Sequence, residues 1–173
     1  MEKKDLLKDV IKHIDIKSYN STELIDAMRN MSFTSRDTAR AADILMMMCK
    51  EKECTNILTL AGSTSAAGCM QVYVDMVKNK MVDCIVSTGA SIIDMDFFEA
   101  LGFKHYKGTP FIDDKYLRSN YVDRIYDTYI DEEELQNCDA TIKMIADSLE
   151  PRPYSSREFI WELGKWLAAG NAK

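Results

Sequence analysis

The stretch that decides the fold reads Asn56-Ile57-Leu58-Thr59-Leu60, followed at once by Ala61-Gly62-Ser63-Thr64-Ser65-Ala66-Ala67-Gly68. A second stretch has the same form: Cys84-Ile85-Val86, then Ser87-Thr88-Gly89-Ala90-Ser91. Each is typical of a buried strand, a loop of small residues and the start of a helix. An open parallel sheet presents backbone N–H groups to a phosphate or nucleotide at such junctions. The two stretches therefore predict neighbouring parallel strands with a ligand site at their carboxyl ends.

The spacing of these strands predicts a βαβ unit. Strands are expected at 56–61 and 83–87, joined by a helix from about 66 to 80, and the crossover should be right-handed. Apolar residues at helical spacing predict further helices, one after a cap at Asn20 or Ser21 and others near 33–48, 94–101, 132–149 and 156–167. The predicted class is α/β, a partial Rossmann-like parallel sheet with flanking helices.

Three segments carry weaker patterns. Residues 1–20 are charged and are predicted to form an N-terminal arm, with a short helix over 5–14. Residues 103–130 are rich in loop residues, and their tyrosines are expected in an interface or the core. Residues 168–173 are expected to be a loose chain end.

Composition excludes some classes of partner. The 173 residues carry a net charge of −6, which disfavours a nucleic-acid partner. No apolar run is long enough for a transmembrane helix, and no signal-peptide core follows the first residues. The five cysteines contain no Cys-x-x-Cys pair, and the two histidines lie far apart, so no metal site is predicted. Cys69 and Cys84 are expected to be packed thiols, and free thiols indicate a reducing, cytoplasmic setting.

From about residue 11 onward, the chain resembles the N-terminal half of deoxyhypusine synthases. The resemblance rests on ordered motifs: Lys12-His13-Ile14-Asp15-Ile16-Lys17, Ser32-Phe33-Thr34-Ser35-Arg36-Asp37, Ala39-Arg40-Ala41-Ala42-Asp43-Ile44-Leu45, Ser65-Ala66-Ala67-Gly68, Asn79-Lys80-Met81-Val82-Asp83, Val86-Ser87-Thr88-Gly89-Ala90-Ser91, Glu99-Ala100-Leu101-Gly102, His105-Tyr106-Lys107-Gly108, Val122-Asp123-Arg124-Ile125-Tyr126-Asp127 and the segment from Ser155 to Lys165. A single glycine loop is weak evidence, but several motifs in the right order are specific. Family members, like the related homospermidine synthases, are roughly twice this length.

The resemblance implies a chemistry. The family enzyme oxidises spermidine with NAD and forms an imine on an enzyme lysine. It then passes the butylamine group to a lysine of the translation factor 5A precursor. The active form is a tetramer with sites at subunit interfaces.

The resemblance also implies which residues contact ligands. The NAD-contacting loops correspond to Gly62, Ser63, Thr64, Ser65 and Ala66, and to Thr88, Gly89 and Ala90. Small residues let a cofactor approach the backbone, although an ordinary tight turn has the same composition.

Two acids, Asp94 and Asp96, fall where the family carries acidic residues near the polyamine and the ribose. A carboxylate suits a polyammonium ligand, but acids also favour the first turn of any helix. The family's catalytic lysine lies in a C-terminal segment that nothing here matches. Lys165 is therefore interpreted as a solvated helix residue, and no catalytic residue is predicted in residues 1–173.

A family site needs a glycine-rich loop, further acids and the lysine from the later half. Three explanations stay open: one half of a split enzyme completed by a C-terminal half-chain, a fragment of a longer chain, or an inactive regulatory or scaffold paralogue. The split enzyme is favoured, with residues 21–173 as the N-terminal half of the NAD-binding domain in a hetero-oligomer. A homospermidine synthase half, with putrescine as acceptor, is a further alternative.

Overall fold

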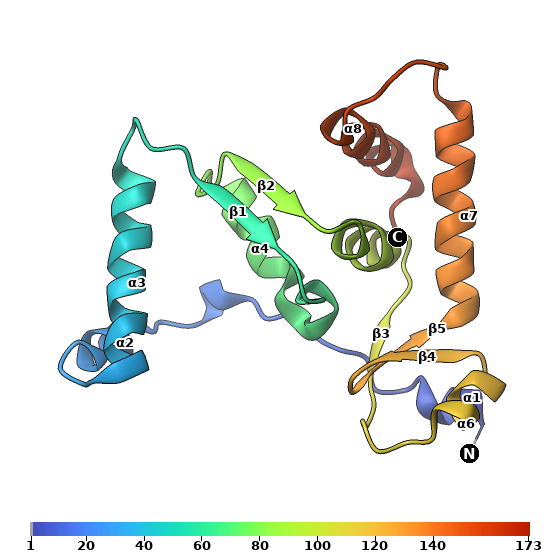
Figure 1. Ribbon diagram of the computed structural model, residues 1–173, viewed down its shortest axis with the longest axis horizontal. Helices are drawn as coiled ribbons and strands as arrows, with labels where there is room; N and C mark the ends of the chain where they lie inside the picture. The colour runs from blue at the N-terminus through green and yellow to red at the C-terminus, as the bar shows by residue number, and fades with distance from the viewer. Residues whose placement is uncertain (1) are drawn as a thin grey trace. The chain divides into compact units, whose positions relative to one another are not determined.

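The computed structural model describes residues 2–173 (Figure 1). Its elements in chain order are α1 (Lys3–Leu6), η1 (Ile16–Ser18), α2 (Thr22–Met28), α3 (Phe33–Lys50), β1 (Ile57–Leu60), η2 (Ser65–Cys69), α4 (Met70–Lys78), β2 (Cys84–Ser87), η3 (Ser91–Phe97), α5 (Phe98–Ala100), β3 (His105–Lys107), α6 (Asp114–Ser119), β4 (Val122–Ile125), β5 (Thr128–Asp131), α7 (Glu132–Ser148), α8 (Ser156–Trp166) and η4 (Leu167–Asn171). They group into two compact units. Unit 1 comprises residues 2–12, 61–68 and 88–173, and unit 2 comprises residues 13–60 and 69–87.

Unit 2 contains the predicted parallel pair. β1 and β2 pair in parallel from Ile57 opposite Cys84 to Leu60 opposite Ser87, which confirms the expected α/β class with a small parallel sheet and flanking helices. Side-chain bonds fix where the strands begin, because Asn56 Nδ2 donates to the Met81 carbonyl over 3.2 Å and Asp83 Oδ2 accepts from the Asn56 N–H over 2.8 Å. The pair is therefore anchored by polar contacts at its start.

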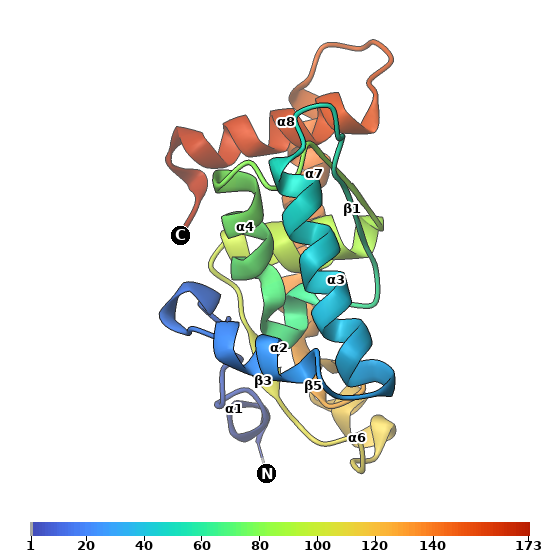
Figure 2. The same cartoon turned by 90° about the vertical axis from the view of Figure 1, so that its left-hand side faces the viewer.

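The helices α2 and α3 form a hairpin in the same unit (Figure 2). The Asn20 side chain accepts a bond from the Thr22 N–H over 3.0 Å, which supports the predicted helix start. Arg29 pairs with Asp43 across the hairpin. Lys17 also lies in unit 2, where it bonds the buried Asp75 of α4 over 2.8 Å.

Unit 1 contains a second sheet that the sequence analysis missed. Residues 103–130 were expected to be loop-rich, but they hold an antiparallel sheet of order β3-β5-β4. The expectation was wrong because these strands are only three or four residues long. The β4–β5 turn also lacks the glycine that marks many hairpins. Tyr126 takes the left-handed conformation there, at φ 55°.

The cores of the protein lie in unit 1. One cluster joins the helices after β2 to α7 and α8 through Phe97, Phe98, Leu101, Ile130, Cys138, Ile145 and Leu163. A smaller cluster packs the N-terminal arm on the antiparallel sheet through Leu6, Leu117, Val122 and Tyr129. Of the expected tyrosines, Tyr129 is buried in the core, whereas Tyr121 and Tyr126 are exposed.

Both ends of the chain are more ordered than expected. The helix predicted over 5–14 is wrong: α1 ends at Leu6, and Val10 then pairs with Tyr106 at the edge of β3. The Ile11 N–H donates to the His105 carbonyl over 2.8 Å, so the arm continues the sheet. At the other end, η4 replaces the expected loose segment, and the Lys173 N–H donates to the Ala100 carbonyl over 3.0 Å.

The cysteines only partly follow expectation. Cys69 is half-buried, but Cys84 is exposed, so its predicted packing is wrong. The reason is that Cys84 shares an exposed face of β2 with Val86. Within residues 2–173, no helix is both long and apolar enough to span a lipid bilayer.

Candidate functional site

The two predicted ligand loops start from neighbouring strand ends. Leu60 and Ser87 are register partners in the parallel pair, so Ala61 and Thr88 begin their loops side by side. Adjacent strands lie about 4.8 Å apart, which is within the span of one phosphate group and its hydrogen bonds. Both loops thus lie at the carboxyl ends of parallel strands, the place where open sheets of this class bind ligands.

The first loop makes a sharp turn and then enters a helix. Gly62 and Ser63 both have positive φ, at 78° and 60°, and a Cβ on Gly62 would meet nothing within 4 Å. The Ala67 N–H donates to the Ser63 carbonyl over 3.1 Å, which closes the first turn of η2. This backbone is open to a ligand on the side of Gly62.

The residues of this loop differ in burial. Gly62 is exposed, Ser63 and Thr64 are half-buried, and Ser65 and Ala66 are each only 1% exposed. The Ser65 Oγ is buried without a hydrogen-bond partner in the described chain. A buried hydroxyl without a partner is costly, so Ser65 is suited to a ligand that supplies one.

The second loop leads directly into a helix. Thr88 Oγ1 lies 3.2 Å from the Ser91 Oγ, and it accepts a hydrogen bond from the Ser91 N–H over 3.4 Å. Gly89 and Ala90 are exposed, and a Cβ on Gly89 would meet open space. Helical backbone starts at Gly89 and continues as η3 from Ser91, rather than starting at the expected Asp94, so the first helical N–H groups belong to Gly89 and Ala90.

The predicted acids lie on η3, but they do not form one cluster. Asp94 and Asp96 are two residues apart, so they leave the helix in different directions. Burial raises the pKa of the Asp94 carboxyl, and the nearby Asp139 carboxylate on α7 raises it further. Asp94 is therefore a half-buried acid beside a second negative charge, an environment that favours a cation.

Asp139 is the residue that sequence reasoning missed. It lies in the middle of α7 and looks like any exposed helix acid. Only the packing of α7 on η3 brings it near Asp94, and the Cys138 thiol beside it donates to the Ile93 carbonyl over 3.6 Å. No local signal in the sequence could have paired the two acids.

Lys165 and His105 each have a partner within the chain. Lys165 lies on α8 and pairs with Glu162 over 2.6 Å, one turn earlier on the helix. His105 is 1% exposed on β3, with its Nδ1 2.6 Å from Glu99 Oε1. No group of three metal-ligating side chains occurs within residues 2–173.

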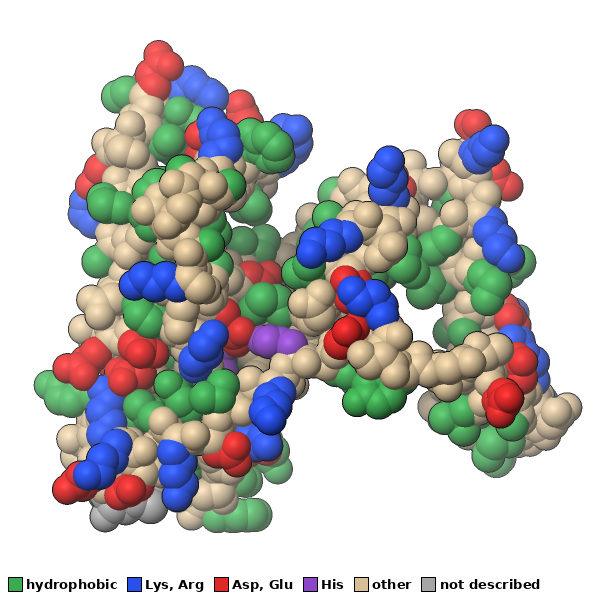
Figure 3. Space-filling model, turned by 180° about the vertical axis from the view of Figure 1, so that it is seen from behind, with side chains coloured by type: hydrophobic (Ala, Val, Ile, Leu, Met, Phe, Trp, Pro, Cys, Tyr) green, Lys and Arg blue, Asp and Glu red, His purple; other side chains and the backbone are tan. Residues whose placement is uncertain are grey.

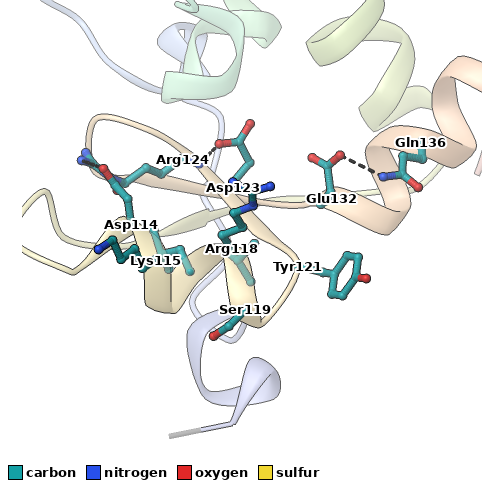
Figure 4. A pocket seen from close by; sticks show the side chains of 11 residues that line it. Asp114, Lys115, Arg118, Ser119, Tyr121, Asp123, Arg124, Glu132 and Gln136 are labelled. Atoms are coloured by element: carbon teal, nitrogen blue, oxygen red, sulfur yellow. Dashed lines mark hydrogen bonds and ion pairs between the residues drawn. The ribbon is translucent and has the colours of Figure 1, made fainter.

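A separate hollow of about 1110 Å³ lies in unit 1 between α6, β4 and the start of α7 (Figure 4). Arg124 Nε bonds Asp114 Oδ1 over 2.6 Å at one side of it, and Gln136 donates to Glu132 at the other. None of the predicted ligand residues lines this hollow.

On the face shown in Figure 3, basic and acidic side chains are interspersed, and no large basic patch for a polyanion is visible.

Comparisons with known proteins agree on one family. The family model described as deoxyhypusine synthase matches residues 23–172. A "Deoxyhypusine synthase-like protein" of Caulobacter vibrioides is 67% identical over 99% of this chain and 47% of its own length. One from Coxiella burnetii is 62% identical over 99% of this chain and 49% of its own length.

A more distant relative is similar over the same part. A "Probable deoxyhypusine synthase 2" of Methanosarcina mazei is 39% identical over 92% of this chain and 46% of its own length. The chain thus spans about half the length of the curated relatives it matches.

Proposed function

The chain belongs to the deoxyhypusine synthase family, and from this premise we propose that it is the N-terminal half-subunit of a split, NAD-dependent deoxyhypusine synthase. The reaction is transfer of the butylamine group of spermidine to a lysine of the translation factor 5A precursor. Family membership supports the reaction class. The observation that carries the site is the pair of loops at adjacent strand ends, with the partnerless Ser65 hydroxyl in one of them.

In this proposal NAD is held by the two loops. Gly62, Ser63, Thr64, Ser65 and Ala66 form one side of the site, and Thr88, Gly89 and Ala90 form the other. The open space above Gly62 and Gly89 lets the cofactor reach the backbone, and the Ser65 hydroxyl gains the hydrogen bond it lacks. When bound, NAD supplies the oxidation by accepting a hydride from spermidine.

The substrate side of the proposal uses the acids of η3. Spermidine carries ammonium groups, and Asp94 is a half-buried carboxyl near the carboxylate of Asp139. A bound ammonium would favour the ionised form of Asp94, because an opposite charge offsets the penalty of burial. Asp96 is assigned to the same substrate region.

The imine-forming lysine belongs, in this proposal, to a C-terminal half-chain. The support is that about half of each relative has no counterpart in this chain. Residues 21–173 would form the N-terminal half of the NAD-binding domain and residues 1–20 its arm, in a hetero-oligomer. The five free thiols fit work in the reducing cytoplasm.

The test is co-expression of this chain with a complementary C-terminal half, followed by an assay for NADH formation from spermidine. We expect NADH from the pair and none from either chain alone. Ser65→Ala and Gly89→Val should each lower the rate at limiting NAD, whereas Gly164→Ala, on α8 and with open space around it, should not.

The acceptor is tested in the same assay. Addition of the translation factor 5A precursor should give labelled protein from labelled spermidine. If putrescine is added in place of the precursor and labelled homospermidine forms, the enzyme is a homospermidine synthase. A stable pair that neither binds NAD nor oxidises spermidine would contradict the enzyme and favour a regulatory or scaffold paralogue.

A further inference from the structure

One face of the parallel pair is uncovered and apolar. Side chains alternate between the two faces of a strand, and register partners in a parallel pair share a face. The exposed face therefore consists of Ile57, Thr59, Cys84 and Val86, called here the open sheet face. Ile57 is 57% exposed and Val86 is 56% exposed. The face carries no charged side chain.

The sequence of these strands does not suit a solvated face. Strands with one wet side alternate apolar and polar residues, whereas parallel strands are usually covered on both sides and apolar throughout. On the opposite side, Leu58 and Leu60 are half-buried and Ile85 is 37% exposed, so the open sheet face is the less covered of the two. β1 and β2 also lack other strand neighbours within residues 2–173.

Unit 2 as a whole lacks a core of its own. Among residues 2–173, the one buried hydrophobic residue of unit 2 is Ala39, and both core clusters lie in unit 1. Many apolar side chains of unit 2 are instead exposed: Leu24, Met31, Phe33, Ile44, Leu45, Met46, Met47, Ile57, Val74, Val77, Ile85 and Val86. An exposed apolar surface of this kind marks a site of protein association.

We infer that the open sheet face is the docking surface for the complementary C-terminal half of the synthase. This inference rests on the proposed function and names the surface that its partner covers. The length of the relatives identifies the occupant, because roughly half of each has no counterpart in this chain. The covering surface must be apolar, since a charge placed against Ile57 and Val86 would be buried without a partner.

The exposed thiol of Cys84 provides a probe on this face. The chain is to be co-expressed with the C-terminal half of the Caulobacter relative, and thiol alkylation rates are to be measured by mass spectrometry for the chain alone and for the pair. We expect Cys84 to react readily in the chain alone and at least tenfold more slowly in the pair. Cys49, exposed on α3, serves as the reference thiol, and the buried Cys138 should stay slow in both states.

A matched pair of variants tests the same surface by affinity. Val86→Lys places a charge on the open sheet face, and Met144→Lys does so at an exposed residue of α7 in unit 1. Both sites are exposed, so both variants should keep the circular dichroism spectrum of the chain. We expect Val86→Lys to weaken the complex at least tenfold and Met144→Lys to leave it unchanged.

The outcomes separate this inference from the proposed function. A complex with Cys84 protected but no NADH from spermidine supports the docking surface and contradicts the synthase. NADH formation with Cys84 as reactive as in the free chain supports the synthase and overturns the docking surface. Three other results would overturn the docking surface. The two chains fail to associate, or the alkylation of Cys84 and Cys49 slows by the same factor in the pair. The third is that Cys84 is already protected in a dimer of this chain alone.

Discussion

The Asp94 carboxyl lies in an environment that opposes its own charge. Burial and Asp139 both raise its pKa above the ordinary 3.8. A carboxyl whose pKa is raised by folding destabilises the folded state once it is ionised. This loss of stability is complete at pH values above the pKa in the folded state, and it is absent at pH values below the pKa in the unfolded state. Asp94→Asn should therefore raise the thermal midpoint at pH 7.

The pH dependence of this effect is its signature. The gain from Asp94→Asn should shrink as the pH falls toward 3.8, because the wild-type carboxyl is then protonated as well. Asp139→Asn, which removes only the smaller contribution, should give a smaller gain. Calorimetry at several pH values measures both. A loss of stability in Asp94→Asn at neutral pH would mean that a cation of the protein already balances this acid.

Gly108 is a position where a side chain cannot be accommodated. A Cβ there would lie 2.3 Å from the ring of Tyr129, which is 3% exposed. The ring cannot retreat easily, because the Tyr129 hydroxyl bonds both the N–H and the carbonyl of Thr109. Gly108→Ala should cost about 1–3 kcal/mol in the free energy of unfolding, as overpacking does.

Gly164→Ala is the control for that measurement. Gly164 lies inside α8 with open space around it, so alanine should stabilise the helix by about 0.5–1 kcal/mol. Urea denaturation followed by circular dichroism measures both variants. Equal midpoints for Gly108→Ala and the wild type would show that Tyr129 yields without strain.

How far sequence predicts a residue's surroundings depends on whether the cause is local. The loops with Ser65 and Thr88 follow strand ends as the pattern predicted, because a strand, a small-residue turn and a helix start are written in consecutive residues. The partner of Asp94 could not be predicted, because Asp139 reaches it only through the packing of two helices. The roles of both loops in binding NAD stay a prediction.

The start of α8 is fixed by a capping box. The Ser155 Oγ accepts a hydrogen bond from the Glu158 N–H over 3.2 Å, and Glu158 Oε2 accepts one from the Ser155 N–H over 2.8 Å. These bonds, with Arg152, lower the pKa of Glu158 from 4.5 to about 2. Because the folded pKa is lowered, the stability from this charge is present above pH 4.5 and is lost as the pH falls toward 2.

Glu158→Gln should flatten that part of the stability profile. Glutamine keeps the shape of the capping box but not the charge, so the variant should be less stable at pH 7 and should lose less on acidification between pH 4.5 and 2. Thermal midpoints over this range measure the effect. Glu150→Gln, at an exposed residue before the helix, is the control, and an identical profile for both variants would contradict the role of the cap.

Whole elements were predicted where their patterns were long. The βαβ unit and the helices α3, α7 and α8 were expected close to their observed bounds, since each has a sustained apolar period. The antiparallel sheet was not predicted, because its strands are short and its pairing joins the arm at Val10 to residues near 106 and 130. Such pairing is set by tertiary contacts rather than by local preference.

The two units differ in how firmly their backbone should be held. Protection from hydrogen exchange follows buried contacts, and these are concentrated in unit 1. In the isolated chain, amides of β1 and β2 should exchange faster than those of β5 and α7, by at least tenfold. Exchange followed by mass spectrometry measures this. Equal protection in both sheets would mean that unit 2 needs no outside support.

The N-terminal arm has a consequence for how the protein is made. Leu6 lies in one core cluster with Leu117, Val122 and Tyr129, so the ribosome releases the arm long before the rest of that cluster exists. At ordinary rates of translation the delay is on the order of 10 s. During that time the nascent arm must stay unpaired while residues 13–60 emerge, and unit 1 can close only after its third segment is complete. Chaperones thus meet an apolar side chain, Leu6, that the finished protein buries.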